Sequence, residues 1–181
     1  YDRQTRIINE KWLGQRGVLN DQGDSLNRNM LTDAQWLEAI LRFSALPGTS
    51  RHHWGTDLDI WDAAAVDPDY TLSLTGAEYG PGGVFEEMTQ WLDARIAEDD
   101  AEGFFKPYDR DRGGVAPEPW HISYRPVAGR YLTLLSLELL TPLWTGLPDT
   151  KGEAHEPLAM LSVLSPIGED VMQRYVIIDR R

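Results

Sequence analysis

Hydrophobic positions recur at helical spacing in several segments of this chain. In the first, Thr32 and Gln35 have the spacing of a capping box, in which each side chain bonds to the backbone of the other residue. Trp36, Leu37 and Ile40 then follow on one helical face. The pattern therefore predicts a helix that begins directly after Thr32.

The same spacing predicts two further helices. The second is expected to open at Gly82-Gly83, and its apolar face consists of Val84, Phe85, Met88, Trp91, Leu92 and Ile96. For the third, Ser165 suits the N-cap and Pro166 the first helical position, because proline lacks the N–H that is unbonded there anyway. Its apolar stripe consists of Ile167, Val171 and Tyr175.

Shorter segments predict strands. Residues 57–61 alternate polar and apolar, so Leu58 and Ile60 are expected to face the core. Asp57, Asp59 and Trp61 would then share the opposite face. The other predicted strands are residues 42–44, 70–74, 121–124 and 131–135. Because helices and strands are intermixed without regular βαβ repeats, we expect an α+β fold.

The length of 181 residues favours one domain that spans the whole chain. Residues 1–30 are mostly polar, apart from a short apolar patch at Trp12-Leu13, and are expected to form an irregular N-terminal extension. Residues 109–117 contain two adjacent glycines and several charges. This segment is expected to be a loop, either a lid over a cleft or an ordinary surface loop.

Composition narrows the function by exclusion. The chain is 41% hydrophobic and 25% charged, as in ordinary globular proteins. Its net charge of −12 opposes binding to nucleic acids and to anionic membranes. The absence of cysteine excludes disulfides and thiol catalysis. We find no apolar run of the ~20 residues that span a bilayer, and no signal peptide, although an export signal could have preceded the first residue.

Three of the four histidines fall in two short segments, residues 50–59 and 118–121. Zinc binds imidazole nitrogens and carboxylate oxygens, and a catalytic zinc commonly has three protein ligands. His52 and His121 are candidate ligands, together with a carboxylate of the first segment. Strand alternation places Asp57 and Asp59 on one face, so spacing alone does not choose between them. Two carboxylates this close also call for a cation nearby.

These two segments resemble a known family. SRHHWGTDLD at residues 50–59 is similar to the S-x-H-x-x-G-x-A-x-D motif of zinc D-alanyl-D-alanine carboxypeptidases and dipeptidases of the VanY/VanX type. EPWH at residues 118–121 is similar to their E-x-W-H motif. The similarity runs from about residue 32 to about residue 125, and Asp57 stands where the family motif has alanine.

The resemblance implies a role for each site residue. His52, Asp59 and His121 would bind zinc. With Asp59 as the ligand, Asp57 is expected to accept the other ring N–H of a histidine ligand, a common role for a carboxylate beside a metal site. Glu118 would act as the general base toward the attacking water. Two further residues, Arg42 and Ser50, would bind substrate, and Arg42 would also help to stabilise the oxyanion.

The implied protein is a single zinc peptidase domain with the hedgehog/DD-peptidase fold, a small antiparallel sheet flanked by helices. Its implied activity is hydrolysis of peptidoglycan-type peptides, first of all the D-Ala-D-Ala bond. An L,D-carboxypeptidase, a cell-wall endopeptidase and a non-catalytic zinc-binding interaction module remain alternatives. The resemblance favours the periplasm or cell envelope as the location, without a membrane span or a nucleic-acid partner.

Overall fold

The computed structural model describes residues 1–148 and 151–178. The chain forms two compact units, and each is built from segments that are distant in the sequence. Unit 1 comprises Tyr1–Ser50, Arg112–Ala116 and Leu134–Arg181, and unit 2 comprises Arg51–Asp111 and Pro117–Thr133. None of the described helices is long and apolar enough to cross a membrane.

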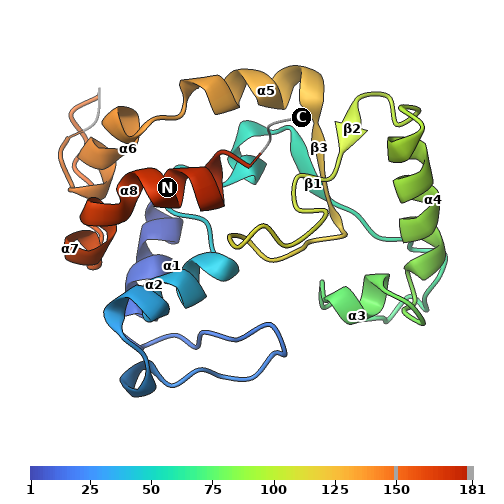
Figure 1. Ribbon diagram of the computed structural model, residues 1–181, viewed down its shortest axis with the longest axis horizontal. Helices are drawn as coiled ribbons and strands as arrows, with labels where there is room; N and C mark the ends of the chain where they lie inside the picture. The colour runs from blue at the N-terminus through green and yellow to red at the C-terminus, as the bar shows by residue number, and fades with distance from the viewer. Residues whose placement is uncertain (149–150, 179–181) are drawn as a thin grey trace. The chain divides into compact units, whose positions relative to one another are not determined.

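Unit 1 is helical. Its longer helices are α1 (Asp2–Trp12), α2 (Asp33–Arg42) and α6 (Leu137–Trp144), and its short ones are η1 (Arg28–Met30), α7 (Leu161–Leu164), η3 (Ser165–Ile167), α8 (Gly168–Val171) and η4 (Met172–Val176) (Figure 1). These elements enclose a core of large apolar side chains. The innermost of them are Ile8, Trp36, Leu37, Ile40, Leu41, Leu46, Leu140, Met160, Leu164 and Met172.

The predicted start of α2 is confirmed. The Thr32 hydroxyl accepts the Gln35 backbone N–H, and the Gln35 side chain accepts the Thr32 backbone N–H, so both partners of the capping box are in place. The predicted strand at residues 42–44 is wrong. The helix continues through Arg42, and the backbone carbonyl of Arg42 accepts the Ala116 N–H.

Two expectations for unit 1 need correction at the chain ends. Residues 2–12 are not irregular but form α1, because Ile8 is 1% exposed and anchors this helix in the core. The C-terminal helical run begins at Leu161 rather than at Ser165. Since Pro166 needs no N–H partner in the first turn, it fits the 3-10 turn between α7 and α8. Val171 and Tyr175 are buried as expected.

Unit 2 contains the sheet. Its elements are η2 (Arg51–Trp54), β1 (Asp57–Asp59), α3 (Gly76–Tyr79), α4 (Glu86–Ala97), β2 (Phe104–Phe105), β3 (His121–Tyr124) and α5 (Arg125–Leu134), whose last residue belongs to unit 1 (Figure 1). The strand order is β1-β3-β2, and both pairings are antiparallel. The α+β class and the strand at residues 121–124 are thereby confirmed.

Of the three residues of β1, Asp57 is the buried one, contrary to the expectation that Leu58 faces the core. The strand ends at Asp59 rather than at Trp61, and Leu58 is 55% exposed. β1 is an edge strand of the described sheet and pairs with β3. Asp57 is 4% exposed and points inward, where the guanidinium of Arg51 supplies the opposite charge. A paired carboxylate can therefore replace an apolar side chain on the buried face.

The predicted strands at residues 70–74 and 131–135 are also wrong. In the first, the Glu78 carboxylate accepts the Tyr70 hydroxyl and the Ser73 backbone N–H, so side chains bind these groups in place of a neighbouring strand. The second lies mostly in α5, where Ala128 and Leu132 are buried one helical turn apart. A short apolar run does not by itself distinguish a strand from a buried helix.

α4 begins later than the glycine pair predicted. Gly83 lies so close to an earlier segment that a Cβ there would stand 2.3 Å from the Ala77 carbonyl oxygen. The glycines therefore form a turn, and the helix starts at Glu86. Trp91 is 60% exposed, and Leu92 is the buried residue of the helix, so the expected apolar face is only partly covered.

Candidate metal centre

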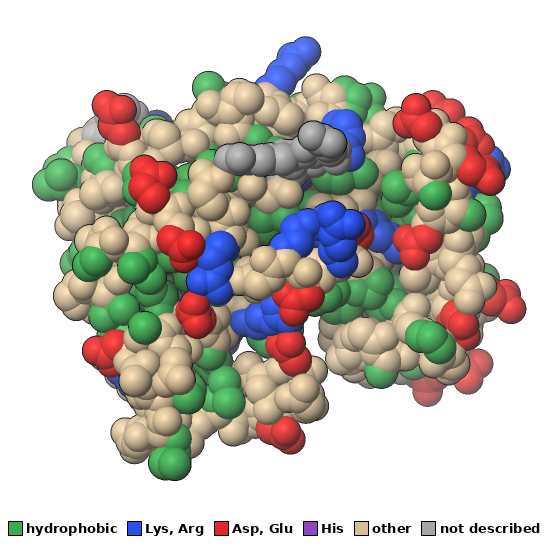
Figure 2. Space-filling model, viewed as in Figure 1, with side chains coloured by type: hydrophobic (Ala, Val, Ile, Leu, Met, Phe, Trp, Pro, Cys, Tyr) green, Lys and Arg blue, Asp and Glu red, His purple; other side chains and the backbone are tan. Residues whose placement is uncertain are grey.

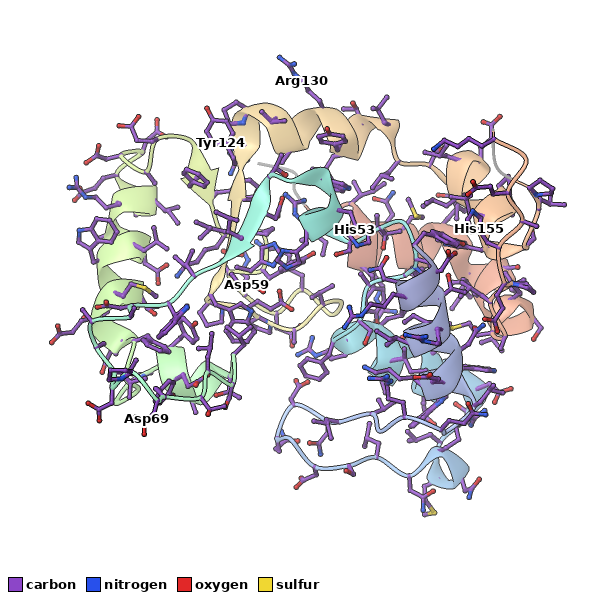
Figure 3. The ribbon with its side chains drawn as sticks, turned by 180° about the vertical axis from the view of Figure 1, so that it is seen from behind. His53, Asp59, Asp69, Tyr124, Arg130 and His155 are labelled. Carbon is purple, nitrogen blue, oxygen red and sulfur yellow. The ribbon has the colours of Figure 1, made fainter. Side chains whose placement is uncertain are left out.

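One cluster of metal-ligating side chains lies entirely within unit 2. The β1–β3 register places Asp59 opposite His121, and the preceding turn, η2, carries His52. One potential ligand atom from each of these residues lies within 4.8 Å of the other two. Figure 3 labels Asp59 on β1 and His53 on the turn before it. The sheet and one turn thus bring together the three predicted ligands.

Hydrogen bonding identifies the nitrogen of His52 that is available for a metal. Its Nδ1 lies 3.3 Å from the backbone carbonyl oxygen of Asp57, which can only accept a hydrogen bond. In the neutral ring this contact requires the proton on Nδ1, which leaves the lone pair on Nε2. Nε2 lies 3.5 Å from Oδ1 of Asp59, so the unprotonated nitrogen is on the side of the cluster.

His121 shows the same arrangement with its two nitrogens exchanged. Its Nε2 lies 2.9 Å from Oδ1 of Asp57, which confirms the predicted contact between this carboxylate and a histidine. Its Nδ1 lies 3.5 Å from Oδ1 of Asp59 and 3.1 Å from Oε2 of Glu118. This Nδ1 is buried and makes no hydrogen bond. A buried nitrogen that lacks a hydrogen bond and lies beside two carboxylates fits a cation such as Zn²⁺.

The electrostatics of His121 agree with this fit. Burial alone would lower the pKa of the imidazole. The hydrogen bond to Asp57 and the negative charge of Glu118 outweigh burial and raise the pKa above its ordinary value. The surroundings therefore favour positive charge at this ring, whether it comes from a proton or from a metal ion.

Asp57 is held ionised by the groups around it. Burial by itself would raise the pKa of this carboxyl, but hydrogen bonds from His121, Thr56 and Arg51 outweigh burial and hold the pKa well below its usual range. Ser123 donates a further hydrogen bond to Oδ2 over 3.0 Å. The carboxylate is therefore a permanent acceptor at neutral pH.

Glu118 reaches the cluster through a tight turn. The His121 backbone N–H donates to the Glu118 carbonyl across Pro119 and Trp120, and the Glu118 N–H donates to the Tyr108 carbonyl. The expected stiff turn leading into a strand is therefore present, because Pro119 has a fixed φ and cannot extend a helix. The Glu118 side chain is 21% exposed, so its carboxylate is open to water as well as to the cluster.

Two further predicted site residues, Arg42 and Ser50, belong to unit 1. Arg42 is in unit 1, where its guanidinium forms a two-pronged ion pair with Asp21 and donates to the Gly114 carbonyl. Ser50 directly precedes η2 and is half-buried. His53 is exposed and is not among the three clustered residues. The structure leaves the substrate roles of Arg42 and Ser50 as predictions.

Arg51 is the residue of the centre that the sequence interpretation missed. Its side chain is 1% exposed, and its Nε donates to Oδ1 of Asp57 over 2.8 Å. The signal was available, because two carboxylates at positions 57 and 59 call for a nearby cation. Arg51, six positions before Asp57, supplies that cation.

Two imidazoles and one carboxylate around a common point, with a second carboxylate beside them, form a donor set typical of metal-dependent hydrolases. Comparison with known families agrees with this class. The family described as VanY, D-alanyl-D-alanine carboxypeptidase, matches residues 1–127. The chain therefore belongs to this family, and its helices and small antiparallel sheet are consistent with the expected hedgehog-like fold.

The match begins well before residue 32, where the recognisable similarity was expected to start. Two proteins of Haemophilus influenzae, both described as uncharacterized, are also similar. One is 36% identical over 103 residues, which cover 56% of this chain and 76% of that protein. The other is 48% identical over 46 residues, 25% of this chain and 32% of that protein. No solved structure matches the chain significantly.

Proposed function

We propose that this protein is a zinc-dependent carboxypeptidase that removes the terminal D-alanine from peptidoglycan-type peptides. The observation that carries the proposal is the buried, unbonded Nδ1 of His121, which faces Asp59 and Glu118 in a chain of the VanY family. A zinc ion bound by His52, Asp59 and His121 would polarise the scissile carbonyl and make a water molecule more acidic.

The chain's own residues account for the proton transfers. Glu118 accepts a proton from the attacking water as the new C–O bond forms at the amide carbon. It returns that proton to the leaving nitrogen as the C–N bond breaks, so atoms and charge balance. Its partial exposure suits this task, because one carboxylate must meet both water and substrate.

Two residues are proposed to bind the C-terminal end of the peptide substrate. In this proposal Arg42 pairs with a carboxylate of the substrate or with the developing oxyanion, and Ser50 donates a hydrogen bond near His52. A peptidoglycan substrate would place the protein in the periplasm or cell envelope. Ser50 is the first residue of the first family motif, and Arg42 lies upstream of that motif.

Defined muropeptides test the proposed function. The zinc-loaded protein is incubated with pentapeptides ending in D-Ala-D-Ala, with tetrapeptides ending in a single D-alanine after an L-centre, and with cross-linked dimers. Mass spectrometry then identifies the products. Loss of one D-alanine from the pentapeptide alone is the expected result. Cleavage restricted to the tetrapeptide or the dimer would replace the proposal by an L,D-carboxypeptidase or an endopeptidase. Absence of all three products would contradict an enzymatic role.

A further inference from the structure

Asp57 contacts both histidines of the candidate metal centre. Its backbone carbonyl accepts from Nδ1 of His52 over 3.3 Å, and its Oδ1 accepts from Nε2 of His121 over 2.9 Å. In each ring the nitrogen that faces Asp57 is therefore the protonated one. The other nitrogen of each ring lies 3.5 Å from Asp59 Oδ1. One residue thus determines which nitrogen of each imidazole faces the cluster.

The side chain of Asp57 can hold this position only if its charge is compensated. It is buried, and an uncompensated carboxylate in such a place is strongly unfavourable. Arg51 supplies the opposite charge, with Nε 2.8 Å from Oδ1 of Asp57 and Nη2 2.7 Å from Oγ of Ser123. The Thr56 hydroxyl adds a 2.6 Å hydrogen bond to Oδ2. The Asp57 carboxylate therefore accepts four hydrogen bonds, from Arg51, Thr56, His121 and Ser123.

Arg51 is itself held rigidly. Its guanidinium carbon lies 4.7 Å from the centre of the Trp54 ring and 5.7 Å from that of Phe105. Aromatic faces attract a cation at such distances. Its Nη1 is buried without a hydrogen bond, so the two rings, the Asp57 charge and the Ser123 hydroxyl together offset the desolvation of the guanidinium. The family motif has alanine at position 57, so this ion pair is a departure from it in this chain.

We propose that Arg51 and Asp57 act as a pair of positioning residues: Arg51 keeps Asp57 in place as an acceptor, and Asp57 fixes His121 in the tautomer whose Nδ1 is free for the metal. This inference rests on the metal centre of the proposed function. The proposed positioning role predicts one result that a purely structural ion pair does not. Loss of the acceptor should weaken metal binding even in a protein that is as stable as the wild type.

Two double variants separate these roles. Arg51→Met/Asp57→Ala removes both charges and the acceptor, while Arg51→Met/Asp57→Asn removes both charges but keeps a carbonyl oxygen opposite Nε2 of His121. Replacing a buried ion pair by neutral groups is often tolerated, so both variants are expected to fold. Loss of the partner of a ligating histidine typically lowers metal affinity about 10–100-fold. We expect that loss in the alanine variant and recovery of most of it in the asparagine variant.

The measurements are zinc affinity, by competition with a chelator, and thermal unfolding of the metal-free proteins. A matched control is Lys106→Met/Asp93→Ala, which removes another ion pair of unit 2 whose lysine side chain is 5% exposed. Its zinc affinity should equal that of the wild type. Equal affinities in all three double variants, or equal losses in the alanine and asparagine variants at matched stability, would overturn the positioning role. Failure of the wild type itself to bind zinc would instead overturn the proposed function.

A second readout needs no substitution at the pair. In metal-free wild-type protein with ¹⁵N-labelled histidine, long-range ¹H–¹⁵N spectra at alkaline pH report which ring nitrogen carries the proton. His121 is assigned by comparison with His121→Gln. The expected result is protonation at Nε2. A His121 ring protonated at Nδ1, or a mixture of the two tautomers, would contradict the proposal even if the double variants failed to fold.

Discussion

Glu118 is the side chain on which the proposed chemistry depends most directly. Its carboxylate lies 3.1 Å from the free nitrogen of His121 and remains partly exposed. It is separate from the three proposed ligands, so its contribution to turnover can be tested apart from metal binding. The role of Arg42 can also be tested by a single substitution. Its guanidinium already pairs with Asp21 and donates to the Gly114 carbonyl, so a structural role in unit 1 is the alternative to substrate binding.

Glu118→Gln preserves size and hydrogen bonding but cannot accept a proton from water. We expect turnover of a D-Ala-D-Ala peptide to fall about 10²–10⁴-fold, the usual contribution of general acid–base catalysis. Zinc content and thermal stability should stay near those of the wild type. Turnover is measured by release of D-alanine. A variant as fast as the wild type would disprove the role of Glu118. If neither protein cleaves but both bind a partner equally, the protein is an interaction module.

Arg42→Lys retains the charge but loses the planar fork. If Arg42 binds a carboxylate of the substrate, kcat/KM on a carboxylate-ended peptide should fall about tenfold or more, since a charge-assisted hydrogen bond contributes ~1.5–3 kcal/mol. Zinc content should be unchanged. Asp21→Asn is the matched control, because it weakens the ion pair of Arg42 without changing Arg42 itself. Equal stability losses in both variants, with unchanged kinetics in both, would limit Arg42 to a structural role in unit 1.

At the scale of elements, hydrogen bonds from side chains to the backbone decided several boundaries. The capping box of Thr32 and Gln35 starts α2 where the sequence indicated, because both partners lie within one helical turn. Around Glu78, similar hydrogen bonds take the place of the strand that was predicted at residues 70–74. This carboxylate is 8% exposed and accepts hydrogen bonds from the segment that precedes α3.

These bonds make unit 2 sensitive to acid. Burial would raise the pKa of Glu78, but hydrogen bonds from Tyr70, Ser73 and Thr75 outweigh burial and lower it. A carboxyl with a lowered folded pKa stabilises the fold above its ordinary pKa of ~4.3, and this contribution is lost as the pH falls through the folded value. Glu78→Gln should therefore cost about 1–3 kcal/mol of unfolding free energy at neutral pH.

The difference between Glu78→Gln and the wild type should shrink as the pH is lowered below about 4.3. Urea unfolding at a series of pH values measures it. Glu87→Gln, on the exposed side of α4, is the control and should differ from the wild type by less than about 0.5 kcal/mol at every pH. A difference that stays constant on acidification would show that the Glu78 charge is not what stabilises the loop.

For the whole molecule, the net charge of −12 opposes binding to nucleic acids and anionic membranes. Acidic side chains gather around α4 and the turn that follows it, at the right of Figure 2. The exposed acidic residues there are Glu87, Asp93, Glu98, Asp99, Asp100 and Glu102. The candidate metal centre draws its ligands from three elements, η2, β1 and β3, so a bound ion would tie them together.

Removal of the metal should therefore lower thermal stability. A ligand present at 100 times its Kd stabilises the folded state by ~2.7 kcal/mol, so chelation should lower the Tm of the wild type by about 5–10 °C. His121→Ala and Asp59→Ala should bind little zinc, and their Tm should not respond to a chelator. The measurements are metal analysis and thermal unfolding with and without EDTA. Full zinc occupancy in both variants would refute the ligand assignment.

The sequence by itself determined those features whose cause is local. The capping box that starts α2 depends on two residues three positions apart, and it was predicted. The strand at residues 121–124 was also predicted, although it pairs with two distant segments of the chain. The two motifs also predicted which histidines and carboxylates cluster, and the match over residues 1–127 placed the chain in the VanY family. The acceptor role of Asp57 followed from the same reasoning.

Only the tertiary structure decided which charges are buried together. Leu58 is exposed while Asp57 is buried, because burial of a strand face depends on what packs against it and not on the alternation of polar and apolar residues. Likewise, Arg42 and Arg51 both precede Asp57 in the chain, and sequence separation does not reveal which guanidinium pairs with it. Arg51 does so because η2 folds back onto β1, where Asp57 and the ring of Trp54 hold its guanidinium out of water.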